Sequence, residues 1–126
     1  MTSNFRVLGA GVWGLAFSDY LLKLGHNVEI FCRDTNLSNK NISGLELSHV
    51  SDKNIMSLDT LNAQNSNGEI NIIAVNSKGF SELLNKHESY FNTLDELVSL
   101  TKAPRSTKSR RSLRVVVLTD LAKKCH

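Results

Sequence analysis

The N-terminal third of the chain alternates between apolar runs of strand length and a stretch with helical periodicity. Residues 5–8 form a short apolar run that predicts a β-strand. A helical apolar period then continues to Leu24, and Gly25 supplies a helix stop. Residues 28–32 form a second apolar run of strand length. The pattern therefore predicts a βαβ unit over residues 5–34.

The later apolar runs continue this alternation. The run 69–75 is almost continuously apolar, which is typical of a strand buried on both faces near the centre of a parallel sheet. Shorter runs predict strands at 54–58, 94–102 and 115–118. Strands that alternate with helices predict an α/β fold, a Rossmann-like doubly wound sheet that is mostly parallel.

Polar residues ahead of apolar periods predict where the other helices begin. Ser77 is expected to cap a helix whose apolar positions recur at helical spacing after it. Asp59 or Thr60 is expected to cap a short helix that runs through residue 63. Residues 35–53 are rich in Asn and Ser and predict a loop with one helical turn at 45–49.

Three glycines lie at the predicted turn from the first strand into the first helix. Gly9, Gly11 and Gly14 have the spacing G-x-G-x-x-G, which in this context is the fingerprint of dinucleotide binding. Gly9 permits the tight turn, Gly11 lets a pyrophosphate approach the backbone, and Gly14 lets the helix pack closely on the strand. The phosphates would then meet the free N–H groups and the positive dipole of a helix N-terminus. The sequence therefore predicts NAD or NADP as a cofactor.

The end of the second predicted strand bears on which dinucleotide binds. NAD sites usually place Asp or Glu there to hold the ribose 2′-hydroxyl. Here the strand leads through Cys32 into Arg33 and then Asp34. Arg33 is suited to a 2′-phosphate, whereas Asp34 could still reach a ribose, so the choice stays open. We favour NADP(H) over NAD(H), with two solvated turn charges as the alternative interpretation.

Composition narrows the class of protein. The chain has 126 residues, of which 40% are hydrophobic and 21% charged, as in ordinary globular domains. Cys32 and Cys125 are too few and too distant for a disulfide framework, and the four histidines lack ligand spacing. We see neither a signal-peptide pattern nor an apolar stretch of membrane-spanning length. The expectation is a cytoplasmic protein without a metal site.

The net charge of +3 hides an asymmetry between two parts of the chain. Residues 1–101 carry seven basic and eleven acidic residues, which gives −4. Residues 102–126 carry eight basic residues against Asp120, which gives +7. Six of the basic residues lie within 102–114, and such a cluster could contact nucleic-acid phosphates. Because no aromatic residues are interleaved for base stacking, a solvated tail is the favoured interpretation.

Four sequence blocks together resemble the N-terminal domain of NAD(P)-dependent glycerol-3-phosphate dehydrogenase. The Trp in the glycine turn narrows this resemblance beyond Rossmann proteins in general, and the fourth block resembles a strand that ends in Thr-Lys-Gly in the family. The third block has Asn76 where the family usually has Pro. The blocks are VLGAGVWG at 7–14, FCRD at 31–34, INIIAVNS at 70–77 and SLTK at 99–102.

The resemblance implies roles for individual residues. The backbone around Gly11, Val12 and Trp13 would hold the pyrophosphate, although Trp13 taken alone would be read as a packing residue. Arg33 would face the adenosine ribose or its 2′-phosphate. Lys102 would project toward the nicotinamide and the substrate phosphate, where an ammonium can neutralise a phosphate and polarise a developing alkoxide.

The resemblance also implies an oxidoreductase that interconverts sn-glycerol 3-phosphate and dihydroxyacetone phosphate, in the supply of phospholipid precursors. We expect residues 1–102 to form the dinucleotide-binding domain and 103–126 a basic, divergent tail with one possible strand. The family's helical C-terminal domain, which carries its catalytic lysine, has no counterpart here, as in a fragment or a frameshifted product. The chain alone is therefore expected to be inactive, and we assign no catalytic residue.

Two other functions stay open on the sequence. The glycine turn would also serve a non-enzymatic dinucleotide-binding or regulatory module, and nucleic-acid binding through the basic tail is the less favoured alternative. The sequence leaves open whether the chain forms a homodimer.

Overall fold

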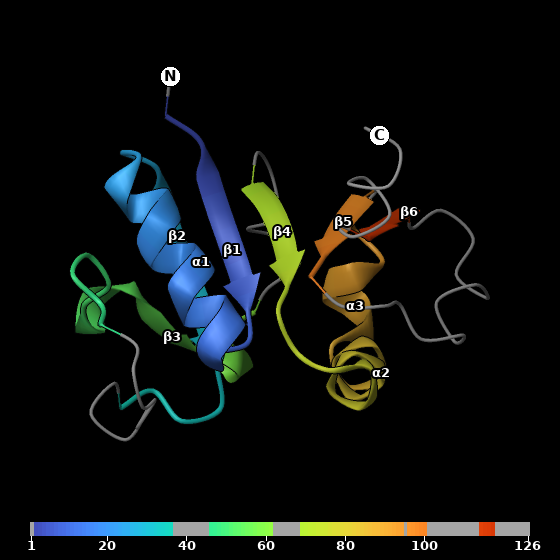
Figure 1. The fold of residues 1–126 in the computed structure, drawn as a ribbon. Coiled ribbons are helices and arrows are strands. Elements are labelled where there is room, and N and C mark those ends of the chain that lie inside the picture. Colours follow the sequence, from blue (N-terminus) through green and yellow to red (C-terminus); the bar gives the residue numbers. More distant parts are fainter. Residues whose placement is uncertain (1, 37–45, 62–68, 95, 101–113, 118–126) are drawn as a thin grey trace.

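Within the part of the chain that the structure describes, six parallel strands form one sheet in the order β3-β2-β1-β4-β5-β6. The computed structural model describes residues 2–36, 46–61, 69–94, 96–100 and 114–117. The prediction of a Rossmann-like parallel α/β sheet is confirmed (Figure 1). The strands are β1 Asn4–Leu8, β2 Asn27–Cys32, β3 Ile55–Ser57, β4 Glu69–Ile73, β5 Glu96–Ser99 and β6 Arg114–Val117.

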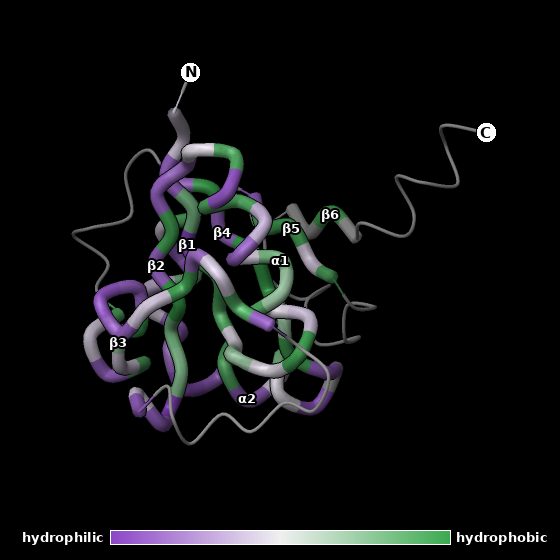
Figure 2. The backbone as a smooth tube through the Cα atoms, turned by 60° about the vertical axis from the view of Figure 1, so that its left-hand side comes forward, coloured by the Kyte–Doolittle hydropathy of each residue, from purple (hydrophilic) through white to green (hydrophobic). Residues whose placement is uncertain are grey.

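Helices cover both faces of the sheet. Helix α1, Val12–Lys23, packs on one face, where Leu15 and Leu21 join a buried cluster with Val7 and Ile30. Helices α2, Ser77–Lys86, and α3, Glu88–Phe91, contribute to a second cluster on the other face, together with Leu8, Phe31 and Ile73. Figure 2 shows hydrophobic residues along the strands and many hydrophilic residues in the turns at their ends. Alternate residues of β1 thus face two different cores, as the period of a strand requires.

The order of the strands reverses at the centre of the sheet. Strand β1 pairs with β2 on one side and with β4 on the other, over five residue pairs each. The chain therefore builds outward from β1 first in one direction and then in the other. In such sheets the crevice at the carboxyl ends of the two strands flanking the reversal is the usual ligand site. The fold therefore places the expected ligand site at the carboxyl ends of β1 and β4.

The predicted helix starts need correction. Asn76, and not Ser77, is the N-cap of α2, because its side-chain oxygen accepts the Gly79 N–H at 2.8 Å. The helix expected from Asp59 or Thr60 is instead the 3-10 helix η3, Leu58–Thr60, which Ser57 caps by accepting the Asp59 N–H. Both caps therefore lie at least one residue before the predicted ones.

The helical turn expected at 45–49 was also misplaced. The described residues 46–50 contain no helix, and the turn forms later as the 3-10 helix η2, Asp52–Asn54. Asp19 of α1 holds the preceding loop, because its carboxylate accepts the backbone N–H groups of His49 at 2.7 Å and Val50 at 2.9 Å. A long-range contact with α1 therefore sets the path of this loop.

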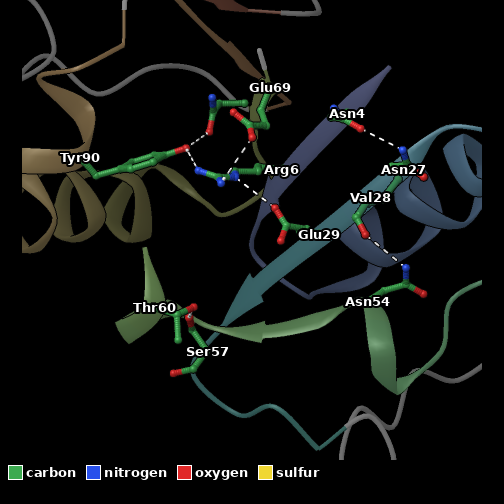
Figure 3. Close-up of polar contacts among 11 residues, drawn as sticks. Asn4, Arg6, Asn27, Val28, Glu29, Asn54, Ser57, Thr60, Glu69 and Tyr90 are labelled. Carbon is green, nitrogen blue, oxygen red and sulfur yellow. Dashed lines mark hydrogen bonds and ion pairs between the residues drawn. The ribbon is translucent and has the colours of Figure 1, made fainter. Parts of the chain in front are cut away.

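A buried arginine lies beneath the α2–α3 side of the sheet (Figure 3). Arg6 of β1 donates to the Glu29 carboxylate and to the Tyr90 hydroxyl, both at 3.2 Å, and pairs with Glu69 at 3.5 Å. Burial alone would lower the pKa of Arg6, but its Tyr90, Glu29 and Glu69 partners raise it. The guanidinium also lies 5.7 Å from the centre of the Phe31 ring. Three polar partners and one aromatic ring thus hold the Arg6 guanidinium within the protein.

Candidate functional site

A cavity of about 630 Å³ lies at the carboxyl ends of β1, β2 and β4. Its walls come from the turn after β1, the end of β2 and the start of α2, with Leu58 of η3 beside them. This is the crevice at the reversal of strand order, the expected ligand position in a doubly wound sheet. The lining residues are 9–11, 31–34, 58, 74–76, 78–79 and 82–83.

Two glycines let the turn after β1 fold against its surroundings. Gly9 has a φ of +122°, and a Cβ added there would lie 2.6 Å from Cγ1 of Val75. A Cβ on Gly14 would lie 2.3 Å from the Gly9 carbonyl oxygen and 3.2 Å from Cβ of Ala74. The separations of 2.6 and 2.3 Å are shorter than atoms tolerate. The turn, α1 and the end of β4 therefore meet this closely only because both residues lack side chains.

Gly11 differs from the other two, because it faces open space. A Cβ built there has no neighbouring heavy atom within 4 Å. Gly11 lines the cavity and is also the N-cap of α1, where it offers no side-chain cap. The first N–H groups of a helix lack acceptors within the helix, and here they belong to Val12, Trp13 and Gly14. This bare turn is a cradle that fits an anionic group.

The start of α2 provides a contrast within the same cavity. Asn76 caps that helix with its own side chain, so one of its early N–H groups is already satisfied. The N-terminus of α1 has no side-chain cap, and neither helix has an acidic residue in its first turn. An anion is therefore better accommodated at α1 than at α2.

The two charged residues after β2 both line the cavity. Arg33 is 77% exposed, and its Nη2 lies 3.1 Å from Oε2 of Glu82 on α2. The Asp34 carboxylate accepts the Asn36 N–H at 2.9 Å, and the Asp34 carbonyl accepts the Cys32 thiol at 3.1 Å. Both residues are solvent-exposed, and each has a polar contact: Arg33 with the Glu82 carboxylate, and Asp34 within its own turn.

The remaining predicted site residues are placed less directly. Val12 and Trp13 lie at the start of α1 with exposed side chains, 51% and 75% respectively, and they do not line the cavity. Trp13 belongs to neither of the two buried clusters among the described residues. Gly14 is buried under the turn. Lys102 lies outside the described residues.

Sequence reasoning missed the contribution of α2. Lys78, Gly79 and Glu82 line the cavity opposite the end of β2. The residues at 78 and 82 are four apart, so they share one face of the helix. The sequence did carry one signal for α2. The apolar block 70–77 predicts a central strand, and the segment that follows a strand beside β1 must border the crevice.

The cavity combines a polar rim with an apolar wall. Phe31, Leu58, Val75 and Leu83 line it together with the charged residues. The described part of the cavity is thus suited to holding an anion next to a flat apolar group.

The described ranges show neither a metal cluster nor a helix that could span a membrane. In the described ranges, no three His, Cys, Asp or Glu side chains gather as a metal site would require. None of the helices in the same ranges has the length and apolar character needed to cross a bilayer.

Comparison with known proteins gives one family. The family model described as "NAD-dependent glycerol-3-phosphate dehydrogenase N-terminus" matches residues 4–124. A curated relative, glycerol-3-phosphate dehydrogenase [NAD(P)+] of Thermoanaerobacter sp. (strain X514), is 31% identical over 117 residues. That alignment covers 90% of this chain but 36% of the relative, so the chain spans about a third of the relative's length.

Solved structures share the fold. RSP, a Rex-family repressor, in complex with beta-NADH is 22% identical, with a TM-score of 0.52 and coverage of 98% of this chain and 58% of that one. RSP in complex with beta-NAD+ and operator DNA is 20% identical, with a TM-score of 0.54 and coverage of 98% and 55%. At these identities the likeness supports the fold alone.

Proposed function

Because this chain belongs to the family of NAD-dependent glycerol-3-phosphate dehydrogenase N-terminal domains, we propose that its cavity binds NAD(P)(H) in an extended form. The observation that carries this proposal is the open glycine turn at the uncapped start of α1. The backbone of Gly11, Val12 and Trp13 would donate to the pyrophosphate, with Gly14 beneath it. The cofactor's adenosine half would then lie toward β2 and α2.

The wall of the cavity fits the adenosine half. The side chains of Leu58, Val75 and Leu83 offer apolar surface for a purine ring. Arg33 and Asp34 lie at the ribose end, where the first would favour a 2′-phosphate and the second a 2′-hydroxyl. The described residues thus provide one surface for each part of this half of the cofactor.

We further propose that the domain serves an oxidoreductase acting on glycerol 3-phosphate and dihydroxyacetone phosphate. When bound, the nicotinamide supplies or accepts the hydride. The contribution of this chain is to hold and orient the dinucleotide against the crevice. Lys102, which follows β5, is proposed to neutralise the substrate phosphate. Residues 1–102 would form the cofactor domain, and the basic segment 103–126 would follow it, adding strand β6 to the edge of the same sheet.

Titration calorimetry with NADH and NADPH tests cofactor binding and the role of Arg33. We expect the unmutated chain to bind both, with NADPH the tighter. Arg33→Ala should reduce the NADPH preference by about tenfold or more, since a charge-assisted hydrogen bond to phosphate is worth roughly 1.5–3 kcal/mol. Lys53→Ala is the matched control, because it removes an exposed cation outside the cavity. Tighter binding of NADH by the unmutated chain would transfer the ribose role to Asp34.

The second test concerns turnover. The 126 residues by themselves are expected to show no reduction of dihydroxyacetone phosphate, even where they bind cofactor. The chain spans about a third of its relative's length, and in the resembling family the substrate pocket lies between two domains. Correct positioning of the reactants accounts for several powers of ten in rate. The measurement is NAD(P)H absorbance at high protein concentration. Saturable turnover that vanishes in Lys102→Ala would contradict this expectation and show that the chain completes its own site.

A further inference from the structure

Glu82 reaches across the cavity to the residue expected to recognise the cofactor ribose. Its Oε2 lies 3.1 Å from Nη2 of Arg33, which joins the end of β2 to α2 over the adenosine part of the cavity. The two residues are 49 positions apart in the chain, so only the fold brings them together. A ligand group that approaches Arg33 therefore also approaches a carboxylate.

The charged side chains that line this end of the cavity have a net charge of zero. Four ionisable side chains of full charge line it: two cations, Arg33 and Lys78, and two carboxylates, Asp34 and Glu82. A ribose hydroxyl is neutral and is unaffected by this balance. A 2′-phosphate carries nearly two negative charges at neutral pH and must compete with Glu82 for Arg33.

The ion pair between Arg33 and Glu82 is expected to add little to the folding stability of the protein. The side chains of Arg33 and Glu82 are 77% and 48% exposed, and exposed pairs of this kind contribute little to folding because water and salt screen them. The same pair faces a ligand cavity, where a bound phosphate displaces water and strengthens each charge interaction. Its effect is therefore expected on ligand selection rather than on folding.

We propose that Glu82 is a specificity-determining residue that lowers the affinity for the 2′-phosphorylated dinucleotide by occupying Arg33. The proposal rests on the proposed function, since it assumes that the cavity binds NAD(P)(H). Arg33 attracts the 2′-phosphate and Glu82 opposes it, so the discrimination between the two cofactors is set by the pair and not by Arg33 alone. Removing the carboxylate while keeping the side chain's shape should release Arg33 for the phosphate.

The test is calorimetric titration of Glu82→Gln with NADPH and NADH. The substitution should tighten NADPH binding by about three- to tenfold, because it removes a like charge and a competitor for Arg33. NADH affinity should stay within about twofold, since its ribose is uncharged at this position. Glu46→Gln is the matched control: it removes the same charge from an exposed residue outside the cavity and should leave both affinities unchanged.

The double variant separates the pair from a general charge effect. In an Arg33→Ala background, Glu82→Gln should give less than half of its effect on NADPH affinity, measured as the logarithm of the fold-change. An unchanged NADPH-to-NADH affinity ratio in Glu82→Gln, with both cofactors bound by the parent, would overturn the role of Glu82 and leave the proposed function standing. Failure of the parent chain to bind either cofactor would overturn the proposed function, and this inference with it.

Discussion

Gly11→Val is expected to weaken dinucleotide binding by about a hundredfold, which corresponds to the loss of one or two charged hydrogen bonds to phosphate. The branched side chain would enter the space in front of the α1 N–H groups, where a Cβ now meets no protein atom. The same open space means that no atom of the protein must move. Valine is a poorer N-cap than glycine, so a stability loss of about 1 kcal/mol is expected.

Calorimetry with NADH and NADPH measures the affinity, and circular dichroism checks that the variant is folded. Gly11→Ala provides a graded control, because its single methyl group should cost less affinity than the two branches of valine. A folded Gly11→Val variant that binds as tightly as the parent would show that the pyrophosphate lies elsewhere.

Gly14→Ala is expected to lower the free energy of unfolding by about 2 kcal/mol or more. The new methyl group would lie 2.3 Å from the Gly9 carbonyl oxygen, which is backbone and has little room to yield. Overpacking of this kind typically costs about 1–3 kcal/mol, occasionally more. Alanine is about 1 kcal/mol better than glycine inside a helix, which offsets part of a clash that we place at the upper end.

Denaturation in urea measures the change, and Gly11→Ala is again the matched control. It makes the same substitution three residues earlier in open space, so its stability should stay within about 1 kcal/mol of the parent. Equal stability of Gly14→Ala and the parent would contradict the close contact between α1 and the turn after β1.

The parts of the fold that were predictable follow from short-range rules. The βαβ unit at the N-terminus was confirmed because a strand, a glycine turn and a helix lie within 30 residues and each has its own local pattern. The helix caps were wrong by at least one residue because Asn76 and Ser57 compete with equally polar neighbours. Local composition does not decide which of several adjacent polar residues turns back to the backbone.

The candidate site was predictable only on its β1 and β2 sides. Gly9, Gly11, Arg33 and Asp34 line the cavity as expected from the glycine motif and the end of the next strand. Glu82 and Lys78 were not foreseen, because their place depends on how α2 crosses the sheet after β4. A contact between residues 33 and 82 has no signature in a single sequence. The assignment of Lys102 stays a prediction.

Strand β1 pairs with a strand on each side, so the backbone on the β1 side of the cavity is expected to open less often than the backbone of α2. Its neighbours on both sides protect β1 amides, and the ladder continues past it, since the Gly9 N–H donates to Phe31 and the Ala74 N–H donates to Leu8, both at 2.9 Å. Helix α2, by contrast, pairs with no strand and is held by side-chain packing in one of the two cores, and such elements open more often than a central strand. Amide hydrogen exchange would therefore be slowest beneath the phosphate cradle and faster on the wall that bears Glu82. The pyrophosphate of a bound dinucleotide would therefore stay in place while its adenosine end dissociates and rebinds.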